Sequence, residues 1–102
     1  MGLGKIMKQA QKMQAKMAEM QERLKDEELE SSAGGGTVKV TITGDLQIKA
    51  ILIDPSAVDP DDVELLQDMT TAAVNEAIRS AQELQERRMA EISGGMNLPG
   101  LM

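Results

Sequence analysis

The sequence predicts an α+β fold in which a small antiparallel three-stranded sheet accompanies two long helices. Apolar residues recur at every third or fourth position toward both ends of the chain, and at every second position in the middle. The first period is typical of an amphipathic helix and the second of a strand. With 102 residues, the chain is one domain or one protomer of a larger assembly. We assign residues 1–95 to the domain and residues 96–102, which show no pattern, to a flexible tail.

The first helix is predicted from an apolar seam whose members are separated alternately by three and four residues. This heptad spacing indicates a helix of about 25 residues. Methionines on such a seam are better explained as core residues than as an adaptable binding surface. The seam consists of Leu3, Ile6, Ala10, Met13, Met17, Met20 and Leu24.

The sheet is predicted from the residues that follow. Residues 28–36 suggest a short edge strand that ends at three glycines. Residues 37–43 alternate, with Val38, Val40 and Ile42 on one face, and form the clearest strand of the chain.

A hairpin is predicted next. Gly44 and Asp45 fit a two-residue loop, after which residues 46–53 return as a further strand. This strand carries apolar residues on both faces, which indicates that something covers both of its sides.

The last helix is predicted to begin with Asp59 as N-cap and Pro60 as its first residue, and to end at Gly94–Gly95. We interpret the aspartates around Pro60 as capping residues rather than as a metal site, because each has a role in starting the helix. The helix would contain about 33 residues and span roughly 50 Å.

The helix lengths predict a homodimer. Helices of roughly 40 and 50 Å exceed the roughly 20 Å strands of a small sheet, so their ends must project from it. Projecting apolar seams need burial, and a second copy of the chain would provide it. Ala73, Ala77 and Ala81 would permit the close approach of another helix.

Composition excludes most catalytic chemistry. The chain has no His, Cys, Phe, Trp or Tyr, so the usual general base, thiolate chemistry, sulfur-based zinc sites and base-stacking platforms are all missing. The three glycines precede a strand and no Gly-Lys-Ser/Thr follows, so they are not a phosphate-binding loop. We therefore predict no enzyme activity, catalytic residue, metal, cofactor or small-molecule substrate.

Charge is distributed unevenly. The first 18 residues hold four lysines and no acidic residue, whereas the whole chain carries a formal charge of −6. On a helix these lysines fall within about 80° of one another over roughly 16 Å, so they can face one polyanionic partner together. The alternative interpretation is that these lysines only solvate an exposed helix face and bind no partner. We call this set the lysine stripe: Lys5, Lys8, Lys12 and Lys16.

No segment approaches the roughly 20 apolar residues of a membrane span, and the N-terminal stretch lacks the apolar run of a signal peptide. We therefore expect a cytoplasmic protein without a membrane partner.

Five stretches of the sequence share a pattern, in order: residues 6–14, 36–44, 53–56, 72–77 and 93–100. Together they resemble the YbaB/EbfC family of small bacterial nucleoid-associated proteins. The resemblance implies an αβββα protomer and a homodimer whose helices project like the arms of tweezers. It also implies binding of double-stranded DNA with limited sequence preference, on the nucleoid, to organise it or to modulate gene expression.

The resemblance also suggests DNA-binding residues. Lys8 and Lys12 lie in the matching Lys-Gln-Ala-Gln-Lys stretch, and the other two members of the lysine stripe are their neighbours. Arg79, Arg87 and Arg88 are weaker candidates on the last helix, and ion pairs with nearby glutamates are the better explanation of Arg87 and Arg88.

Two other functions remain open at this point. Met7, Met13 and Met17 could serve a prefoldin-like holdase that binds apolar clients. The acidic remainder of the chain could instead serve a structural adaptor that binds another protein.

Overall fold

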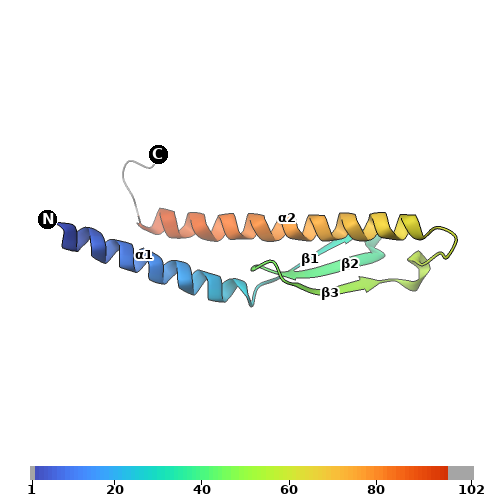
Figure 1. Ribbon diagram of the computed structural model, residues 1–102, viewed down its shortest axis with the longest axis horizontal. Helices are drawn as coiled ribbons and strands as arrows, with labels where there is room; N and C mark the ends of the chain where they lie inside the picture. The colour runs from blue at the N-terminus through green and yellow to red at the C-terminus, as the bar shows by residue number, and fades with distance from the viewer. Residues whose placement is uncertain (1, 97–102) are drawn as a thin grey trace.

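The protein is an elongated molecule of 71 × 25 × 16 Å, seen in a computed structural model that describes residues 2–96 (Figure 1). The predicted α+β fold with αβββα order is confirmed. The predicted tail, residues 96–102, lies outside the described residues except for Met96, at which α2 ends. The elements are α1 (Leu3–Leu24), β1 (Glu28–Ala33), β2 (Val38–Thr43), β3 (Ile48–Ile53) and α2 (Val63–Met96), with short 3-10 turns η1 (Gly34–Gly36) and η2 (Pro55–Ala57).

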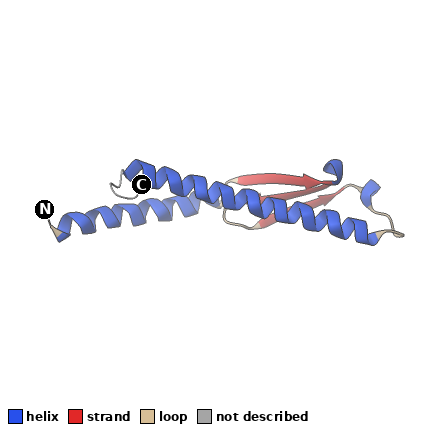
Figure 2. Ribbon diagram, turned by 90° about the horizontal axis from the view of Figure 1, so that it is seen from above, coloured by secondary structure: helices blue, strands red, loops and turns tan. Residues whose placement is uncertain are grey.

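The three strands form one antiparallel sheet in the order β1-β2-β3, and α2 covers one face of it (Figure 2). Val40 in the central strand lies opposite Ser31 of β1 and Ile51 of β3. α2 packs mainly against β1 and β2. The strand β3 therefore forms an edge whose apolar side chains the helix leaves partly uncovered.

The core lies between β2 and α2. Val38, Val40 and Ile42 are completely buried on the inner face of β2, where β-branched side chains suit the pleated backbone. They meet a row of alanines four residues apart on α2, also completely buried, whose small side chains let the helix backbone approach the sheet closely. Our prediction that these alanines permit the close approach of another helix is thus wrong, because the sheet of the same protomer already packs against them. The alanines are Ala73, Ala77 and Ala81.

The β2–β3 hairpin corrects a predicted boundary. Thr43 N donates to the carbonyl oxygen of Gln47 at 2.9 Å, so the loop contains three residues rather than the two predicted. Leu46 occupies the left-handed region at a φ of 68°, as the last residue of such three-residue loops does. The prediction failed because this position is usually filled by glycine, and here it is filled by leucine.

Both ends of α2 also differ from prediction. Asp59 closes a turn of its own, accepting from Asp61 N at 2.9 Å, and the helix begins only at Val63. Asp62 is the residue before the helix, and its carboxylate accepts from Leu65 N at 3.3 Å, as an N-cap does. At the other end, the helix continues through the two glycines where we predicted it to stop.

α1 is attached to the rest of the protein at its C-terminal end. Leu24, only 3% exposed, is its one buried residue in the part of the chain that the structure describes. It packs against Gly44 of the hairpin loop so closely that a β-carbon there would lie 2.7 Å from Leu24 Cδ2 and 2.9 Å from its carbonyl oxygen. From this anchor α1 extends beside α2, away from the sheet (Figures 1 and 2).

We expect Gly44→Ala to lower the free energy of unfolding by about 1–3 kcal/mol, because the added methyl group has to displace the backbone at the anchor of α1. Chemical denaturation followed by circular dichroism measures this. Gly4→Ala is the matched control, since Gly4 lies within α1 with nothing near its β-position, and alanine there should stabilise the helix slightly. Equal effects of the two changes would contradict the proposed close packing.

Candidate nucleic-acid interface

The lysine stripe lies on one uninterrupted helix. α1 contains 22 residues without a break, so its four lysines keep regular helical spacing over roughly 16 Å. All four side chains are exposed, and none forms an ion pair with another described residue. The acidic residues of α1, Glu19 and Glu22, pair instead with Arg23 and Lys25 near its C-terminal end.

The methionine seam and the lysine stripe occupy different sides of α1. Met13, Met17 and Met20 are half-buried where α1 runs beside α2. At 100° per residue, the centre of the stripe lies about 100° around the helix from the centre of these methionines. Packing of α1 on α2 therefore leaves the stripe open to a partner.

The two long helices carry opposite charge. α1 contains five basic and two acidic residues, and its first turn has no acidic residue. α2 contains six acidic and three basic residues. A polyanion such as DNA is therefore attracted to α1 and repelled by most of the α2 surface.

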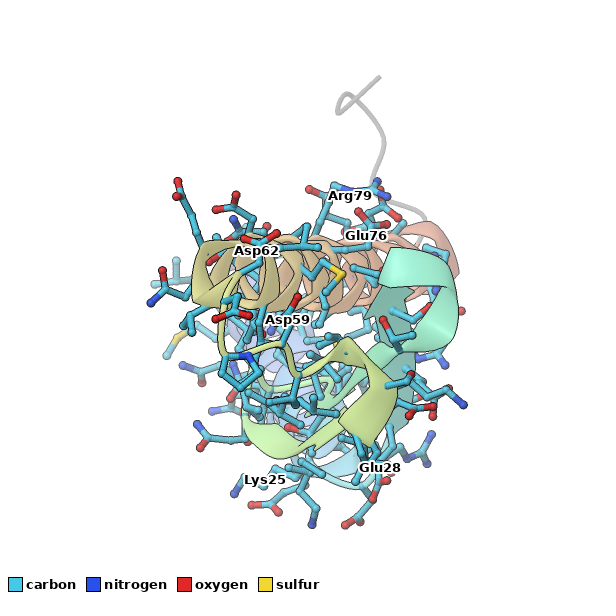
Figure 3. The ribbon with its side chains drawn as sticks, turned by 90° about the vertical axis from the view of Figure 1, so that its right-hand side faces the viewer. Lys25, Glu28, Asp59, Asp62, Glu76 and Arg79 are labelled. Atoms are coloured by element: carbon cyan, nitrogen blue, oxygen red, sulfur yellow. The ribbon has the colours of Figure 1, made fainter. Side chains whose placement is uncertain are left out.

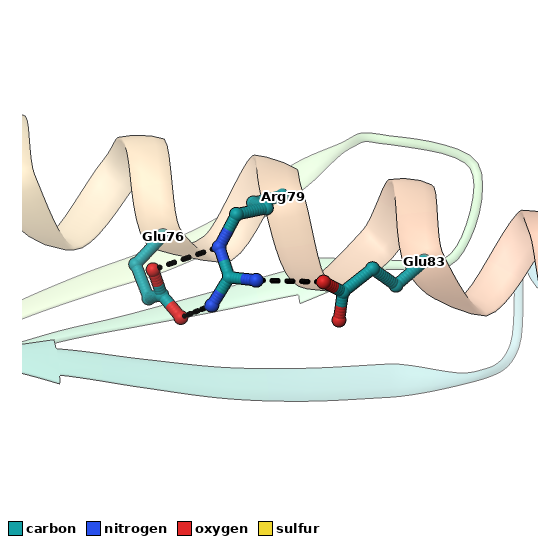
Figure 4. Close-up of polar contacts among 3 residues, drawn as sticks. All are labelled: Glu76, Arg79 and Glu83. Carbon is teal, nitrogen blue, oxygen red and sulfur yellow. Dashed lines mark hydrogen bonds and ion pairs between the residues drawn. The ribbon is translucent and has the colours of Figure 1, made fainter.

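Arg79 is held by two carboxylates of its own helix. Its Nε donates to Glu76 Oε2 at 3.2 Å and its Nη1 donates to Glu83 Oε1 at 2.6 Å, with a further bond from Nη2 to Glu76 (Figure 4). These bonds raise the pKa of Arg79 and lower the pKa of Glu76. The pair lies on the side of α2 that faces away from the sheet (Figure 3). A phosphate would have to displace both carboxylates to reach this guanidinium.

Arg88 is held more firmly, by a residue from a distant part of the chain. Its Nε donates to Glu27 Oε2 at 3.2 Å, its Nη2 also donates to Glu27, and its Nη1 donates to Glu91 Oε1 at 3.1 Å. The two principal side chains are only 33% and 31% exposed. The neighbouring Arg87 is exposed and makes no ion pair within the described part of the chain, so it is the freest of the three arginines.

The hydrogen bonds from Arg88 hold the pKa of Glu27 below its ordinary value. Sequence reasoning pointed to partners on the same helix, and the Glu91 bond fits that expectation. It missed Glu27, because a contact between residues 61 positions apart leaves no spacing signal in the sequence.

A cleft of about 560 Å³ lies between α1 and α2 near the sheet. Three basic residues line it, among them Lys16, but so do four carboxylates and two apolar side chains. This mixed lining does not extend the lysine stripe into the cleft. The candidate interface is therefore the open outer side of α1.

Other kinds of site find no support in the described region. It contains no cluster of three or more carboxylates placed to hold a metal ion. None of its helices is long and apolar enough to cross a membrane.

The model of the YbaB/EbfC DNA-binding family matches residues 1–96. This chain belongs to that family. The match confirms the resemblance found in the sequence, and it agrees with the basic, projecting α1 described above. Membership makes DNA the expected partner, while the DNA-contacting residues have to be argued from the geometry of this chain.

Two curated relatives carry the name nucleoid-associated protein. The protein from Moorella thermoacetica is 55% identical over 103 residues, which cover 98% of this chain and 99% of the relative. The one from Alkaliphilus metalliredigens is 48% identical over 99 residues, covering 97% of this chain and 87% of the relative. The crystal structure of an uncharacterised protein from Helicobacter pylori matches with a TM-score of 0.76 and 24% identity, over 85% of this chain and 91% of that one, and shows the shared fold alone.

We expect Glu27→Gln to destabilise the protein at neutral pH and progressively less below pH 4.5. The folded-state pKa of Glu27 is lowered from 4.5, so its stabilising contribution is present above that pH and is lost as pH falls through the folded pKa. Thermal unfolding of both proteins between pH 3 and pH 7 measures the difference. In an Arg88→Gln background the same change should have little pH-dependent effect; an undiminished effect there would assign the lowered pKa to another neighbour.

Proposed function

We propose that this protein is a nucleoid-associated protein that binds double-stranded DNA through phosphate contacts from the lysine stripe. The proposal rests on four exposed lysines of one uninterrupted helix, none of which forms an ion pair within residues 2–96, in a chain with net charge −6. Family membership supports DNA as the polyanion. Of the last-helix candidates, Arg87 is free to join such an interface, whereas carboxylates hold Arg79 and Arg88.

Binding of this kind has limited sequence preference. Lysine acts as a flexible point charge that suits phosphate oxygens, and phosphate contacts carry no direct sequence information. The chain contains no aromatic side chain for stacking, and the stripe contains no arginine for bidentate recognition of guanine. A protein that coats or bridges DNA with little regard to sequence suits a role in organising the nucleoid or in modulating gene expression, within the cytoplasm.

The proposed DNA-binding unit is a homodimer. Ile48, Ile51 and Ile53 lie on the sheet face that α2 covers, yet each is about 40% exposed because the helix lies over the other two strands. Leu52, on the opposite face, is 60% exposed. Such an apolar edge strand needs a partner, and a second copy would cover it while doubling the number of lysine stripes.

The holdase alternative is less well supported by the geometry. It depends on methionines that are free to bind apolar clients, but Met13 and Met17 are half-buried beside α2. Of the three methionines named for this role, Met7 alone stays largely exposed, at 55%. One exposed methionine does not form an adaptable apolar surface. The adaptor alternative rests on the acidic surface alone, which equally serves solubility.

We expect DNA affinity to fall with salt at a slope near −7 in log–log units, which corresponds to eight phosphate contacts per dimer. Replacing three stripe lysines by Gln should make the slope shallower by about 5, because six phosphate contacts per dimer disappear. Fluorescence anisotropy with duplex DNA across a salt series measures this, at unchanged helicity by circular dichroism. The variant carries Lys5→Gln, Lys8→Gln and Lys12→Gln.

The matched control removes the same charge from lysines outside the stripe, in the variant Lys25→Gln, Lys39→Gln and Lys49→Gln. We expect its salt slope to stay within about 1 of the wild type. Equal losses in the two variants would mean that overall charge, and not the stripe, governs binding. Absence of wild-type binding at low salt would overturn the proposed function.

We expect Ile51→Lys to convert a dimer into a monomer, because it places a charge within the apolar edge that the second copy would cover. Light scattering after size-exclusion chromatography, over a range of concentrations, measures the mass. Gln47→Lys introduces the same charge in the exposed hairpin loop and should leave the dimer intact. A wild-type monomer at all concentrations would refute the dimer.

A further inference from the structure

We propose that Arg88 is a positioning residue, which sets the direction of α1 and thereby of the lysine stripe without touching DNA. The proposal rests on the proposed function, in that it takes the stripe as the DNA-contacting surface. Its basis is the ion pair between Arg88 of α2 and Glu27, because Glu27 lies in the three-residue link between the end of α1 and the start of β1. Glu27 N also donates to the carbonyl oxygen of Leu24 at 3.3 Å, which ties Glu27 to the last residue of α1. A rotation of α1 about the link therefore strains the contacts of Glu27.

The ion pair belongs to a closed set of contacts at the base of α1. The carbonyl oxygen of Glu27 accepts from Gly44 N at 2.8 Å, and the carbonyl oxygen of Gly44 accepts from Gln85 Nε2 at 2.8 Å. Gln85 and Arg88 are three residues apart, so they lie on the same face of α2. The link, the hairpin loop and α2 are thus joined to one another at a single place, next to the buried Leu24.

Apolar packing alone would fix the direction of α1 poorly. Beyond Leu24, the side chains that pack α1 onto α2 are half-buried methionines, whose flexible and unbranched shape tolerates shifts. A two-pronged guanidinium–carboxylate contact is directional. It is also better shielded than the other ion pairs, since Arg88 and Glu27 are 33% and 31% exposed, against 75% and 62% for Arg23 and Glu19.

The length of α1 amplifies any change at its base. Lys5 lies about 28 Å along the helix from Leu24, so a rotation of about 10° displaces it by about 5 Å. This exceeds the roughly 3.4 Å of helix axis that corresponds to one phosphate of a DNA strand. A loosened base therefore costs the lysines their shared register on the phosphate backbone.

A direct role of charge and a positioning role of Arg88 predict opposite effects of one substitution, Glu27→Gln, on DNA affinity. Glu27→Gln removes a negative charge and releases Arg88, so DNA should bind more tightly if Arg88 or net charge mattered directly. If Arg88 positions α1, DNA should bind about five- to tenfold more weakly, as expected for the loss of about one phosphate contact. The matched control is Glu86→Gln, which removes the same charge from an exposed residue of α2 outside the ion pairs described, and should strengthen binding slightly.

Arg88→Lys provides the second variant, because it keeps the charge and loses the two-pronged contact. We expect the same five- to tenfold weakening, about one phosphate contact, whereas Arg23→Lys, at an exposed arginine that pairs with Glu19, should bind like the wild type. Thermal unfolding identifies any variant that fails to fold, and the conclusion then rests on the one that folds. Affinities of folded Glu27→Gln and Arg88→Lys equal to those of their controls would overturn the positioning role.

The arm itself can be followed without DNA, since the chain has no cysteine and accepts spin labels at chosen positions. Gln9→Cys on α1 and Gln82→Cys on α2 are both exposed. The distribution of distances between the two labels is measured in protein diluted with unlabelled protein, so that both labels lie in one protomer. Glu27→Gln should broaden or shift this distribution, and Glu86→Gln should not. If the wild-type protein binds no DNA, the proposed function fails, but this measurement still tests whether Arg88 sets the direction of α1. An unchanged distribution of label distances in Glu27→Gln would overturn the positioning role on its own.

Discussion

The close contact between one row of alanines and one β-strand determines the rest of the structure. Ala73, Ala77 and Ala81 meet the inner face of β2 with no exposed surface on either side. Because this contact is narrow, α2 covers β1 and β2 but leaves β3 as an apolar edge. Because α2 is far longer than the sheet, its second half projects and provides the surface beside which α1 lies. The uncovered edge follows from this contact, and the projecting helices follow from the length of α2 beyond it.

Much of this architecture could be predicted from the sequence because it depends on local periodicity. The heptad spacing of α1 and the alternation of Val38, Val40 and Ile42 gave the right elements. The boundaries that failed depend on backbone choices that composition does not reveal, such as a leucine in the left-handed region at Leu46. The residues of the candidate site fall into the same two groups, those that a local sequence pattern reveals and those that only folding brings together. The lysine stripe is a local pattern, whereas the contact between Arg88 and Glu27 arises only when the chain folds.

Methionine has a particular consequence in a helix that serves as an arm. Met13, Met17 and Met20 bury part of their surface on α2 without the interlocking shape that branched side chains provide. α1 is therefore held beside α2 by contacts that tolerate adjustment, and more rigidly only at its base by Leu24 and the contacts around Glu27. In the proposed function, such contacts let the arm adjust to variations in the shape of DNA.

An acidic protein can bind DNA only if its basic surface is separated from its acidic surface. At physiological ionic strength, charges are screened over about 8 Å. Lys5 lies about 28 Å along α1 from its anchor at Leu24, so the outer end of the stripe stands beyond the screening distance from the carboxylates that follow the helix. Lys16, at the inner end, still lines the cleft that contains four carboxylates. The projection of α1 is therefore an electrostatic requirement as well as a result of helix length. In the proposed function, the acidic remainder repels DNA from the surfaces outside the arms and so helps to orient the bound duplex.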